Sequence, residues 1–470
     1  MNSEYDLVVI GSGPAGEKGA AEAAYFGKKV ALIERAEHPG GAGINTGTVP
    51  SKTLRETALY FSGLLQRGLY GIDYSLKENI SVKDFMYRKQ IVLEEEWQII
   101  NTNLENNKIE TIPGTASLKD ANTVHVNTTS GQELDLKSKV ILIASGSAPF
   151  HPPEINFDHP LIHDSDSILE IDSIPNSMAI IGGGVIASEY ASIFAALGVQ
   201  VTLIAPRDKL MAFIDDEITA ILIKGMEELG VEFLFLDWKA NLEAHADHVT
   251  LLLPEGQKLD CDIALFPAGR QGNIEGLGLE SLGVELGSRG LIKVNANYQT
   301  NIPSIYAAGD VIGFPALASS SMEQGRVAMV HAFGLHAKDA ISPVLPLAVY
   351  TIPEVSMAGL TEEDCIAKNI PYLVGRAYYA KNARGLIIGD KHGMLKLIFS
   401  PVNKALLGVH IVGELASELI HIGADVVEED GTIERFIKAV YNYPTLSEMY
   451  KYAAYDGLMR LDEFDAAARK

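Results

Sequence analysis

Two glycine-rich turns, each between an apolar strand-like run and an alanine-rich helical run, constrain the fold of this sequence most strongly. The first turn, GSGPAG at 11–16, follows the run 6–10 and precedes the periodic stretch 17–26. The second, GGGVIA at 182–187, follows the run 178–181. Glycine at such a turn lets the backbone approach a pyrophosphate, and the next helix directs its N-terminal N–H groups at the charge. The repeat predicts two nucleotide-binding domains in one chain.

The first unit is completed by a second strand at 29–33 that ends in an acid, Glu34. Gly11, Gly13 and Gly16 supply the three glycines of the GxGxxG pattern, and the Glu34 carboxylate can accept hydrogen bonds from a ribose 2′-OH. On its own the pattern is also compatible with a tight turn that binds nothing. The strand, helix and acid in the expected order favour dinucleotide binding.

The second unit uses Gly182, Gly184 and the small residue Ala187, but its second strand does not end in an acid. Ala205 stands at that position, and Arg207 follows two residues later. Without a carboxylate, a 2′-phosphate is not repelled, and Arg207 could pair with one. The alternative is that the Arg-Asp-Lys triplet here is an ordinary solvated turn.

Outside the two units, the sequence predicts an α/β protein with two Rossmann-like nucleotide-binding domains and a C-terminal α+β domain. Residues 51–104 favour helix, 108–143 favour short strands, and 305–310 favour a further strand. From residue 344 the glycine-rich turns stop, and strands at 394–400 and 405–412 precede helices from residue 414. The predicted domains are 1–150 with 276–343, 151–275, and 344–470.

Charge and cysteine content exclude several kinds of partner. The chain has 38 Lys and Arg against 61 Asp and Glu, a formal net charge of −23, which argues against nucleic acid and anionic membranes as partners. Its two cysteines, Cys261 and Cys365, are far apart and have no His or Cys neighbours at metal-ligand spacing. We therefore expect no disulfide framework, no metal site and a cytoplasmic location.

Several further motifs give the whole chain a family resemblance. They are the two glycine-rich turns, Gly40-Gly41 through Pro50-Ser51-Lys52, Ala144-Ser145-Gly146-Ser147, Gly269-Arg270, Ala308-Gly309-Asp310 and Pro353-Glu354. With these motifs, the sequence resembles the pyridine nucleotide–disulfide oxidoreductase family, which includes lipoamide dehydrogenase and glutathione reductase. The resemblance extends over essentially all 470 residues and implies a homodimer, or a higher homo-oligomer, held by the C-terminal domain.

The resemblance implies FAD in the first nucleotide domain and NAD or NADP(H) as substrates in the second. Gly11, Gly13, Gly16 and Glu34 are expected to bind the ADP half of FAD, and Asp310 its ribityl chain. Lys52 is expected near flavin N5, paired with Glu189, although spacing alone also allows two unrelated charges. The remaining cofactor-binding residues implied by the resemblance are Arg35, Ala36, Glu37, His38, Pro39, Gly40, Gly41, Ala42, Gly43, Thr48, Ala116, Gly146, Gly182, Gly184, Ala187, Ala205, Arg207, Gly269, Arg270 and Ala318.

The sequence departs from the family at its redox-active positions. Both cysteines of the family's disulfide are replaced, by Gly43 and Thr48, and the C-terminal catalytic histidine is replaced by Tyr443, while Glu448 remains. Dithiol–disulfide exchange needs a thiolate nucleophile and an acid–base partner, so reduction of lipoamide or glutathione is excluded at this site. We expect Tyr443 to act as a packing wall, because a phenol with a pKa of about 10 is a poor base.

The segment around Thr48 and the run Asn442-Tyr443-Pro444-Thr445 are similar to those of the soluble (Si-specific) NAD(P)+ transhydrogenases. Members of that group often keep the first cysteine, so Gly43 is a departure there too. The resemblance implies hydride transfer from NADPH to NAD+ through FAD, by a ping-pong route with no thiol or metal. Two alternatives stay open: an NAD(P)H oxidase or diaphorase, and a non-catalytic FAD-binding homologue.

Overall fold

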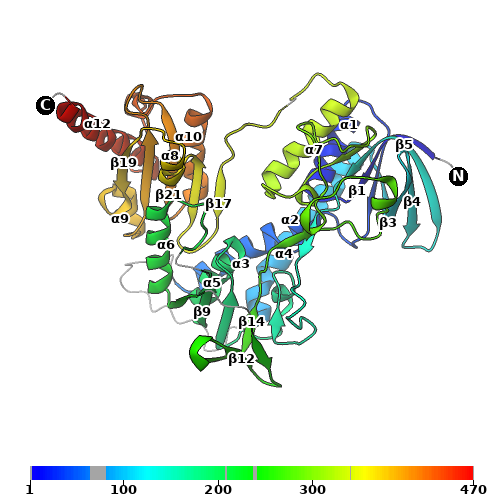
Figure 1. Ribbon diagram of the computed structural model, residues 1–470, viewed down its shortest axis with the longest axis horizontal. Coiled ribbons are helices and arrows are strands. Elements are labelled where there is room, and N and C mark those ends of the chain that lie inside the picture. The colour runs from blue at the N-terminus through cyan, green and yellow to red at the C-terminus, as the bar shows by residue number, and fades with distance from the viewer. Residues whose placement is uncertain (1–2, 64–80, 207–208, 237–240, 339, 469–470) are drawn as a thin grey trace.

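Three regions of regular structure make up the chain (Figure 1). The computed structural model describes residues 3–63, 81–206, 209–236, 241–338 and 340–468. The N-terminal nucleotide-type domain and the C-terminal domain lie at opposite ends of the view, and the second nucleotide-type domain lies between and below them.

The first domain is built on five parallel strands in the order β3–β2–β1–β5–β16. Beyond the parallel part, β3, β4 and β5 continue as an antiparallel meander. The strands are β1 (Ser3–Ile10), β2 (Val30–Glu34), β3 (Glu110–Asp120), β4 (Thr123–Thr128), β5 (Glu133–Ile143) and β16 (Ile305–Ala307). The helices are α1 (Pro14–Tyr25), α2 (Gly41–Asn45), α3 (Thr48–Phe61), α4 (Val82–Asn106) and α7 (Ala318–Phe333).

The second domain repeats this plan. Its five parallel strands are ordered β10–β9–β8–β14–β7, and a three-stranded antiparallel sheet, β11–β12–β13, accompanies them. The elements are β7 (Ile162–His163), β8 (Ser177–Ile181), α5 (Val185–Ala196), β9 (Gln200–Ala205), α6 (Asp216–Glu228), β10 (Val231–Phe235), β11 (Leu242–Ala244), β12 (Val249–Leu252), β13 (Lys258–Cys261) and β14 (Ile263–Leu265). A two-stranded sheet, β6 (Ser147–Pro149) with β15 (Arg270–Gly272), connects the two domains.

The C-terminal domain is an antiparallel sheet with helices. Its five strands are ordered β17–β18–β21–β20–β19. They are β17 (Leu347–Val349), β18 (Val355–Gly359), β19 (Leu373–Tyr378), β20 (Met394–Phe399) and β21 (Leu406–Val412). The helices are α8 (Glu362–Ala367), α9 (Ala383–Ile388), α10 (Ala416–Glu428), α11 (Glu434–Lys438) and α12 (Met449–Ala468).

One of the apolar clusters includes side chains from all three regions. Leu54 of α3, Phe194 of α5, and Val355 and Met394 of the C-terminal sheet belong to one cluster of buried side chains. Burial of apolar surface contributes about 25 cal/mol per Å², so this shared core strongly favours one arrangement of α3 and α5. Among the described helices, none combines the length and apolar character that crossing a bilayer requires.

The two predicted strand–turn–helix units are confirmed, with small errors at their ends. The first helix begins at Pro14, not at residue 17, because proline suits the first turn of a helix. The predicted strand 305–310 is too long: β16 ends at Ala307, and Gly309 has φ of 82°, which ends the extended conformation. The predicted helical region 51–104 falls on α3 and α4, while its residues 64–80 lie outside the described residues.

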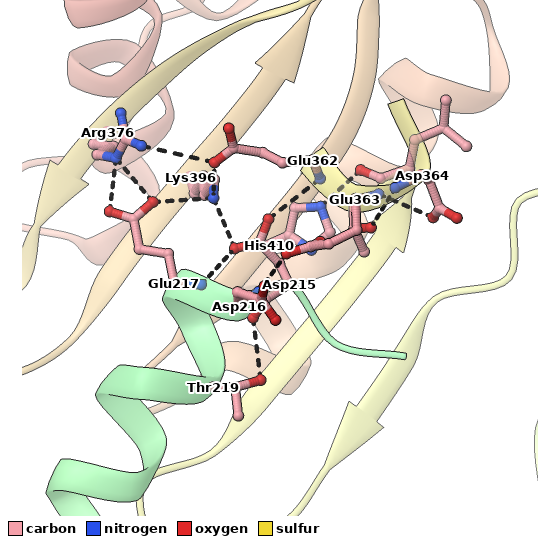
Figure 2. Close-up of polar contacts among 12 residues, drawn as sticks. Asp215, Asp216, Glu217, Thr219, Glu362, Glu363, Asp364, Arg376, Lys396 and His410 are labelled. Carbon is pink, nitrogen blue, oxygen red and sulfur yellow. Dashed lines mark hydrogen bonds and ion pairs between the residues drawn. The ribbon is translucent and has the colours of Figure 1, made fainter. Parts of the chain in front are cut away.

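A buried polar cluster connects the second nucleotide domain to the C-terminal domain (Figure 2). We call it the Lys396 cluster, and it consists of Asp215, Glu217, Glu362, Arg376 and Lys396. The Lys396 ammonium lies 2.7 Å from Asp215 Oδ1 and 3.0 Å from Glu217 Oε2, and it also pairs with Glu362. The three carboxylates are close enough to hold a metal ion, but the Lys396 ammonium already lies among them.

The opposite charges of Lys396 and its carboxylate partners stabilise one another in this cluster. Burial alone would raise the pKa of Asp215, but the hydrogen bond from Lys396 and the nearby positive charges hold that pKa below its ordinary value. Burial likewise opposes the charged form of Lys396, yet its bonds to Asp215 and Glu362 raise its pKa. The side chains of Asp215 and Lys396 are each only 1% exposed, so neither charge can turn to solvent.

Replacing Lys396 by methionine is expected to lower the free energy of unfolding by about 3–5 kcal/mol, because it leaves the buried Asp215 carboxylate without its cation. The loss should be greatest near neutral pH. It should shrink as pH falls below about 4, where a carboxylate with a depressed pKa finally takes up a proton and loses its stabilisation. Urea unfolding at several pH values measures this.

Lys404→Met, which breaks the more exposed Lys404–Glu434 pair, is the control and should cost about 0–1 kcal/mol. Equal losses in both variants would contradict this interpretation.

Candidate functional site

The first glycine-rich turn forms a close-fitting backbone cradle. A Cβ built on Gly11 would lie 2.4 Å from the Ala144 carbonyl oxygen, and one built on Gly16 would lie 1.9 Å from the Gly11 oxygen. Gly13 precedes α1 and offers no side-chain cap, so the first N–H groups of the helix remain available to a ligand. Uncapped N–H groups at a helix N-terminus favour an anionic group such as a pyrophosphate.

Glu34, at the end of β2, is held against this turn. One carboxylate oxygen accepts hydrogen bonds from the Ser12 N–H (2.9 Å) and the Ser12 hydroxyl (2.6 Å), and the other accepts one from the Ala36 N–H (2.8 Å). A carboxylate has about four lone-pair directions, so one remains for a ribose hydroxyl. The position agrees with the role expected from the sequence.

The segment 35–43 lies against the same turn. The Gly40 N–H donates to the Ser12 hydroxyl (3.1 Å), and a Cβ on Gly41 would lie 2.9 Å from Gly13 Cα. His38 stacks on Trp97 of α4 with ring centroids 3.6 Å apart. Within the predicted segment, Gly40, Gly41 and Gly43 contact the turn directly. Cofactor contacts of Arg35, Ala36, Glu37, His38, Pro39 and Ala42 stay predictions.

An extended dinucleotide fits the groups gathered here. A cavity of about 750 Å³ opens beside the turn and is lined by Ser12, Pro14, Gly40 and residues of α4. Behind Gly11, the buried Ser145 hydroxyl oxygen has no hydrogen-bond partner among the described residues. A buried hydroxyl without a partner beside the turn is compatible with a polar ligand there.

The predicted Lys52–Glu189 pair is confirmed. The Lys52 ammonium on α3 lies 2.8 Å and 3.0 Å from the two carboxylate oxygens of Glu189 on α5. Glu189 is 4% exposed and Lys52 is 26% exposed, so the pair has one buried side and one open side. The ammonium also lies 5.0 Å from the ring centre of Tyr350, whose pKa burial raises, so that phenol stays protonated near neutral pH.

By the family resemblance, Gly43 and Thr48 are predicted to occupy the positions of the family's disulfide. Gly43 lies in the short helix α2, and Thr48 is the first residue of α3, one turn before Lys52. A Cβ on Gly43 would lie 3.0 Å from Pro14 Cγ, so α2 packs tightly on the start of α1. Restoring a side chain at position 43 would require Pro14 to move by a few tenths of an ångström.

Asp310 belongs to a polar network that includes Arg270. Asp310 accepts a hydrogen bond from the Ser147 hydroxyl (2.8 Å), which in turn accepts one from Arg270 Nε (2.8 Å). Arg270 also pairs with Asp166 at 3.3 Å. Gly146 and Gly269, with φ of 71° and 93°, precede the two strands that carry Ser147 and Arg270. In this chain the Arg270 guanidinium therefore bonds to protein groups, and its contact with a cofactor stays a prediction.

The positions of the second glycine-rich turn correspond one to one with those of the first. Ile10 pairs with Ile33 across β1 and β2, and Ile181 pairs with Ile204 across β8 and β9. Glu34 in the first unit therefore corresponds to Ala205 in the second.

Gly183 is the counterpart of Ser12 in this comparison, and a Cβ on it would lie 3.3 Å from the Ala205 Cβ. Gly182 and Gly184 flank it, and buried Ala187 lies in the first turn of α5. Ala205 thus stands where an acid would contact the turn. Arg207 lies outside the described residues.

Tyr443 and Glu448 lie in the C-terminal domain, between α11 and α12. Tyr443 is 74% exposed, so it covers little of its own chain. Ala116 lies in β3, and Ala318 is the first residue of α7. The roles of all four residues in binding or catalysis stay predictions.

The comparisons with known proteins agree with this geometry. Residues 5–325 match the family described as pyridine nucleotide-disulphide oxidoreductase, and residues 345–454 match the dimerisation domain of that family. The chain belongs to the pyridine nucleotide-disulphide oxidoreductase family. Its membership confirms the family and the fold class expected from the sequence and identifies the chain as an oxidoreductase.

Two relatives show which members of the family this chain is similar to. A Mycobacterium tuberculosis protein named soluble pyridine nucleotide transhydrogenase is 43% identical over 459 residues, which are 97% of this chain and 98% of the relative. A Marinomonas protein of the same name is 41% identical over 461 residues, 97% of this chain and 99% of the relative. The predicted similarity to soluble transhydrogenases is thus confirmed.

Solved structures of the family share the whole fold. LpdA from Mycobacterium tuberculosis superposes with a TM-score of 0.88 at 26% identity, covering 96% of this chain and 99% of LpdA. The HOCl-induced flavoprotein disulfide reductase RclA from Escherichia coli gives 0.86 at 25% identity, with 96% and 99% covered.

Sequence reasoning missed several residues that support this family site. Ser12 joins Glu34 to Gly40, and its place inside the GxGxxG turn could have indicated this. The Tyr350 N–H donates to Glu189, and the Tyr350 ring lies against the Lys52 ammonium. Arg55 donates to the oxygen of the next residue, Thr351. Arg55 lies one helical turn from Lys52, so the i, i+3 spacing was a usable signal. Nothing in the local sequence around Tyr350 indicates that its N–H reaches Glu189.

Proposed function

We propose that the chain transfers hydride from NADPH to NAD+, giving NADP+ and NADH, with FAD bound at the first glycine-rich turn. The observation that carries the proposal is the redox site: a paired Lys52 and Glu189 are retained, while Gly43, Thr48 and Tyr443 replace the groups that thiol chemistry needs. The relatives named soluble pyridine nucleotide transhydrogenase support the same activity.

In this proposal bound FAD would supply the redox chemistry that hydride transfer between two nicotinamides needs. The chain's own residues bind the dinucleotides, orient them and exclude water. The turn residues Gly11, Gly13 and Gly16 and the N-terminus of α1 hold a pyrophosphate, and Glu34 holds a ribose. Lys52 presents a positive charge that Glu189 keeps in place, and this charge stabilises negative charge that develops beside it.

The second glycine-rich turn admits both dinucleotides. An acid at the position of Ala205 would accept hydrogen bonds from a 2′-OH and repel a 2′-phosphate, and Ala205 does neither. Described residues near the turn include one cation, Lys209, which pairs with Asp216, and the Met211 N–H donates to the Gly183 oxygen (2.8 Å). We propose that Arg207, assisted by Lys209, pairs with the 2′-phosphate of NADPH.

The assembled enzyme is proposed to be a cytoplasmic homodimer with domains at 1–150 plus 276–343, 151–275 and 344–470. The match to the family's dimerisation domain supports the assembly. The exposure of Tyr443 supports a role for this side chain at a partner's surface. We infer that Tyr443 and Glu448 of each subunit close the other subunit's flavin site, with Tyr443 excluding water.

Anaerobic absorbance spectroscopy tests the proposed reaction. Purified protein should be yellow, NADPH should bleach it, and NAD+ added after removal of excess NADPH should restore the colour. The return of colour with oxygen or a quinone but not with NAD+ would instead assign an oxidase or diaphorase. A yellow protein that NADPH does not bleach would identify a non-catalytic homologue.

Ala205→Glu is expected to shift the second site toward NADH. By its correspondence with Glu34, the new carboxylate would face the turn and repel a 2′-phosphate, and such like-charge contact costs several kcal/mol. The ratio of NADPH to NADH dissociation constants should rise by at least about 10-fold, measured by titration of each dinucleotide.

Ala205→Gln is the matched control, because it adds the same bulk without the charge. Ala205 is fully buried, so both variants meet the same steric constraint. If glutamine shifts the ratio as much as glutamate, the effect is steric and the assigned electrostatic role is wrong.

A further inference from the structure

A second buried ion pair lies one helical turn beyond Lys52 on α3. Arg55 Nη2 lies 3.0 Å from Glu354 Oε1, and the two side chains are only 5% and 8% exposed. Lys52 and Arg55 are three residues apart, so both point from α3 toward neighbouring positions. Glu354 belongs to the C-terminal domain, which means that this pair connects two domains next to the Lys52 site.

The segment that carries Glu354 is fixed to both nucleotide domains by its backbone. We call residues 350–354, between β17 and β18, the bridging segment. Its Tyr350 N–H donates to Glu189 Oε1 (2.9 Å), and its Thr351 oxygen accepts from Arg55 Nε (3.0 Å). Its Ile352 N–H donates to the Ser192 hydroxyl on α5 (3.1 Å).

The bridging segment supplies a donor that Glu189 needs. One carboxylate oxygen of Glu189 accepts from both the Lys52 ammonium and the Tyr350 N–H, and a carboxylate this buried is costly to leave without such donors. The Tyr350 ring lies against the Lys52 ammonium at the same time. Displacement of the bridging segment would therefore disturb both members of the pair.

Glu354 is itself anchored within the C-terminal domain. Its second carboxylate oxygen accepts from the Ser417 N–H (3.2 Å) and hydroxyl (3.0 Å) next to the start of α10. Arg55 consequently binds a carboxylate that cannot easily move. Its guanidinium uses separate nitrogens for Glu354 and the Thr351 oxygen, a geometry that the single ammonium of lysine cannot reproduce in full.

We propose that Arg55 and Glu354 are positioning residues for the redox site. They hold the bridging segment so that Tyr350 keeps Glu189 and Lys52 in their observed positions. The positive charge of Lys52 is thereby fixed where negative charge develops during hydride transfer. The inference rests on the proposed function in one respect, namely that Lys52 lies beside the flavin.

The test uses the holoenzyme with Arg55→Met and Arg55→Lys, and it measures the visible spectrum and midpoint potential of the bound flavin as well as its rate of reduction by NADPH. A displacement of about 1 Å can cost up to about 100-fold in rate, so we expect Arg55→Met to slow reduction by about 10- to 100-fold. The midpoint potential should become more negative, and the dissociation constant for NADPH should stay unchanged. Arg55→Lys should lie between Arg55→Met and the unaltered enzyme.

A double variant separates positioning from general stabilisation. If Arg55 acts through Lys52, the variant Arg55→Met with Lys52→Met should reduce no more slowly than Lys52→Met alone. Lys89→Met is the matched control: Lys89 is a buried cation on α4 that donates to the Leu169 oxygen (3.0 Å) and not to the bridging segment. It should leave the flavin potential and spectrum unchanged.

An unchanged potential and rate in Arg55→Met, or additive losses in the double variant, would overturn the inference. If Arg55→Met does not fold, Glu354→Gln provides the same test, because the amide keeps an acceptor for Ser417 but loses the charge that binds Arg55. The flavin potential does not depend on NAD+. Failure of NAD+ to restore colour would therefore reject the proposed function while leaving this test intact.

Discussion

The ion pair between Lys52 and Glu189 is the interaction on which the arrangement of this molecule depends. Its members come from α3 of the first domain and α5 of the second, and the backbone of the third domain completes it through the Tyr350 N–H. Glu189 is almost fully buried, and a buried carboxylate needs such partners. A shift of any one domain would leave a charge unpaired. The ion pair and the apolar core around it therefore favour one arrangement of the three domains.

Around this pair the family's fold is retained, and we propose that its thiol chemistry is absent. The cradle at the first turn, Glu34 and Asp310 lie where we propose that a flavin dinucleotide binds. The positions predicted for the family's disulfide carry Gly43 and Thr48, and the two cysteines of the sequence lie in other elements: Cys261 in β13 and Cys365 in α8. Among the described residues, the proposed site can position groups and hold charge but offers no thiol nucleophile.

The sequence predicted those parts of the site that are local. Both glycine-rich turns follow from short-range patterns, and the contrast between Glu34 and Ala205 could be found by comparing two copies of one unit. The Lys52–Glu189 pair was expected only through resemblance. Arg55 with Glu354, and Asp215 with Lys396, join residues that are distant in sequence, and single-sequence patterns carry no information about such contacts. The role of Tyr443 depends on a second chain and stays a prediction.

The central claim is that hydride exchange here involves the flavin and no thiol. Anaerobic reductive titration of the holoenzyme tests this most directly, because each redox centre takes up a fixed number of electrons. The holoenzyme should take up about two electrons per bound flavin, with full bleaching at that point, since a disulfide would add a further two-electron couple. Uptake of about four electrons per flavin would contradict it and would require a second redox centre in each subunit.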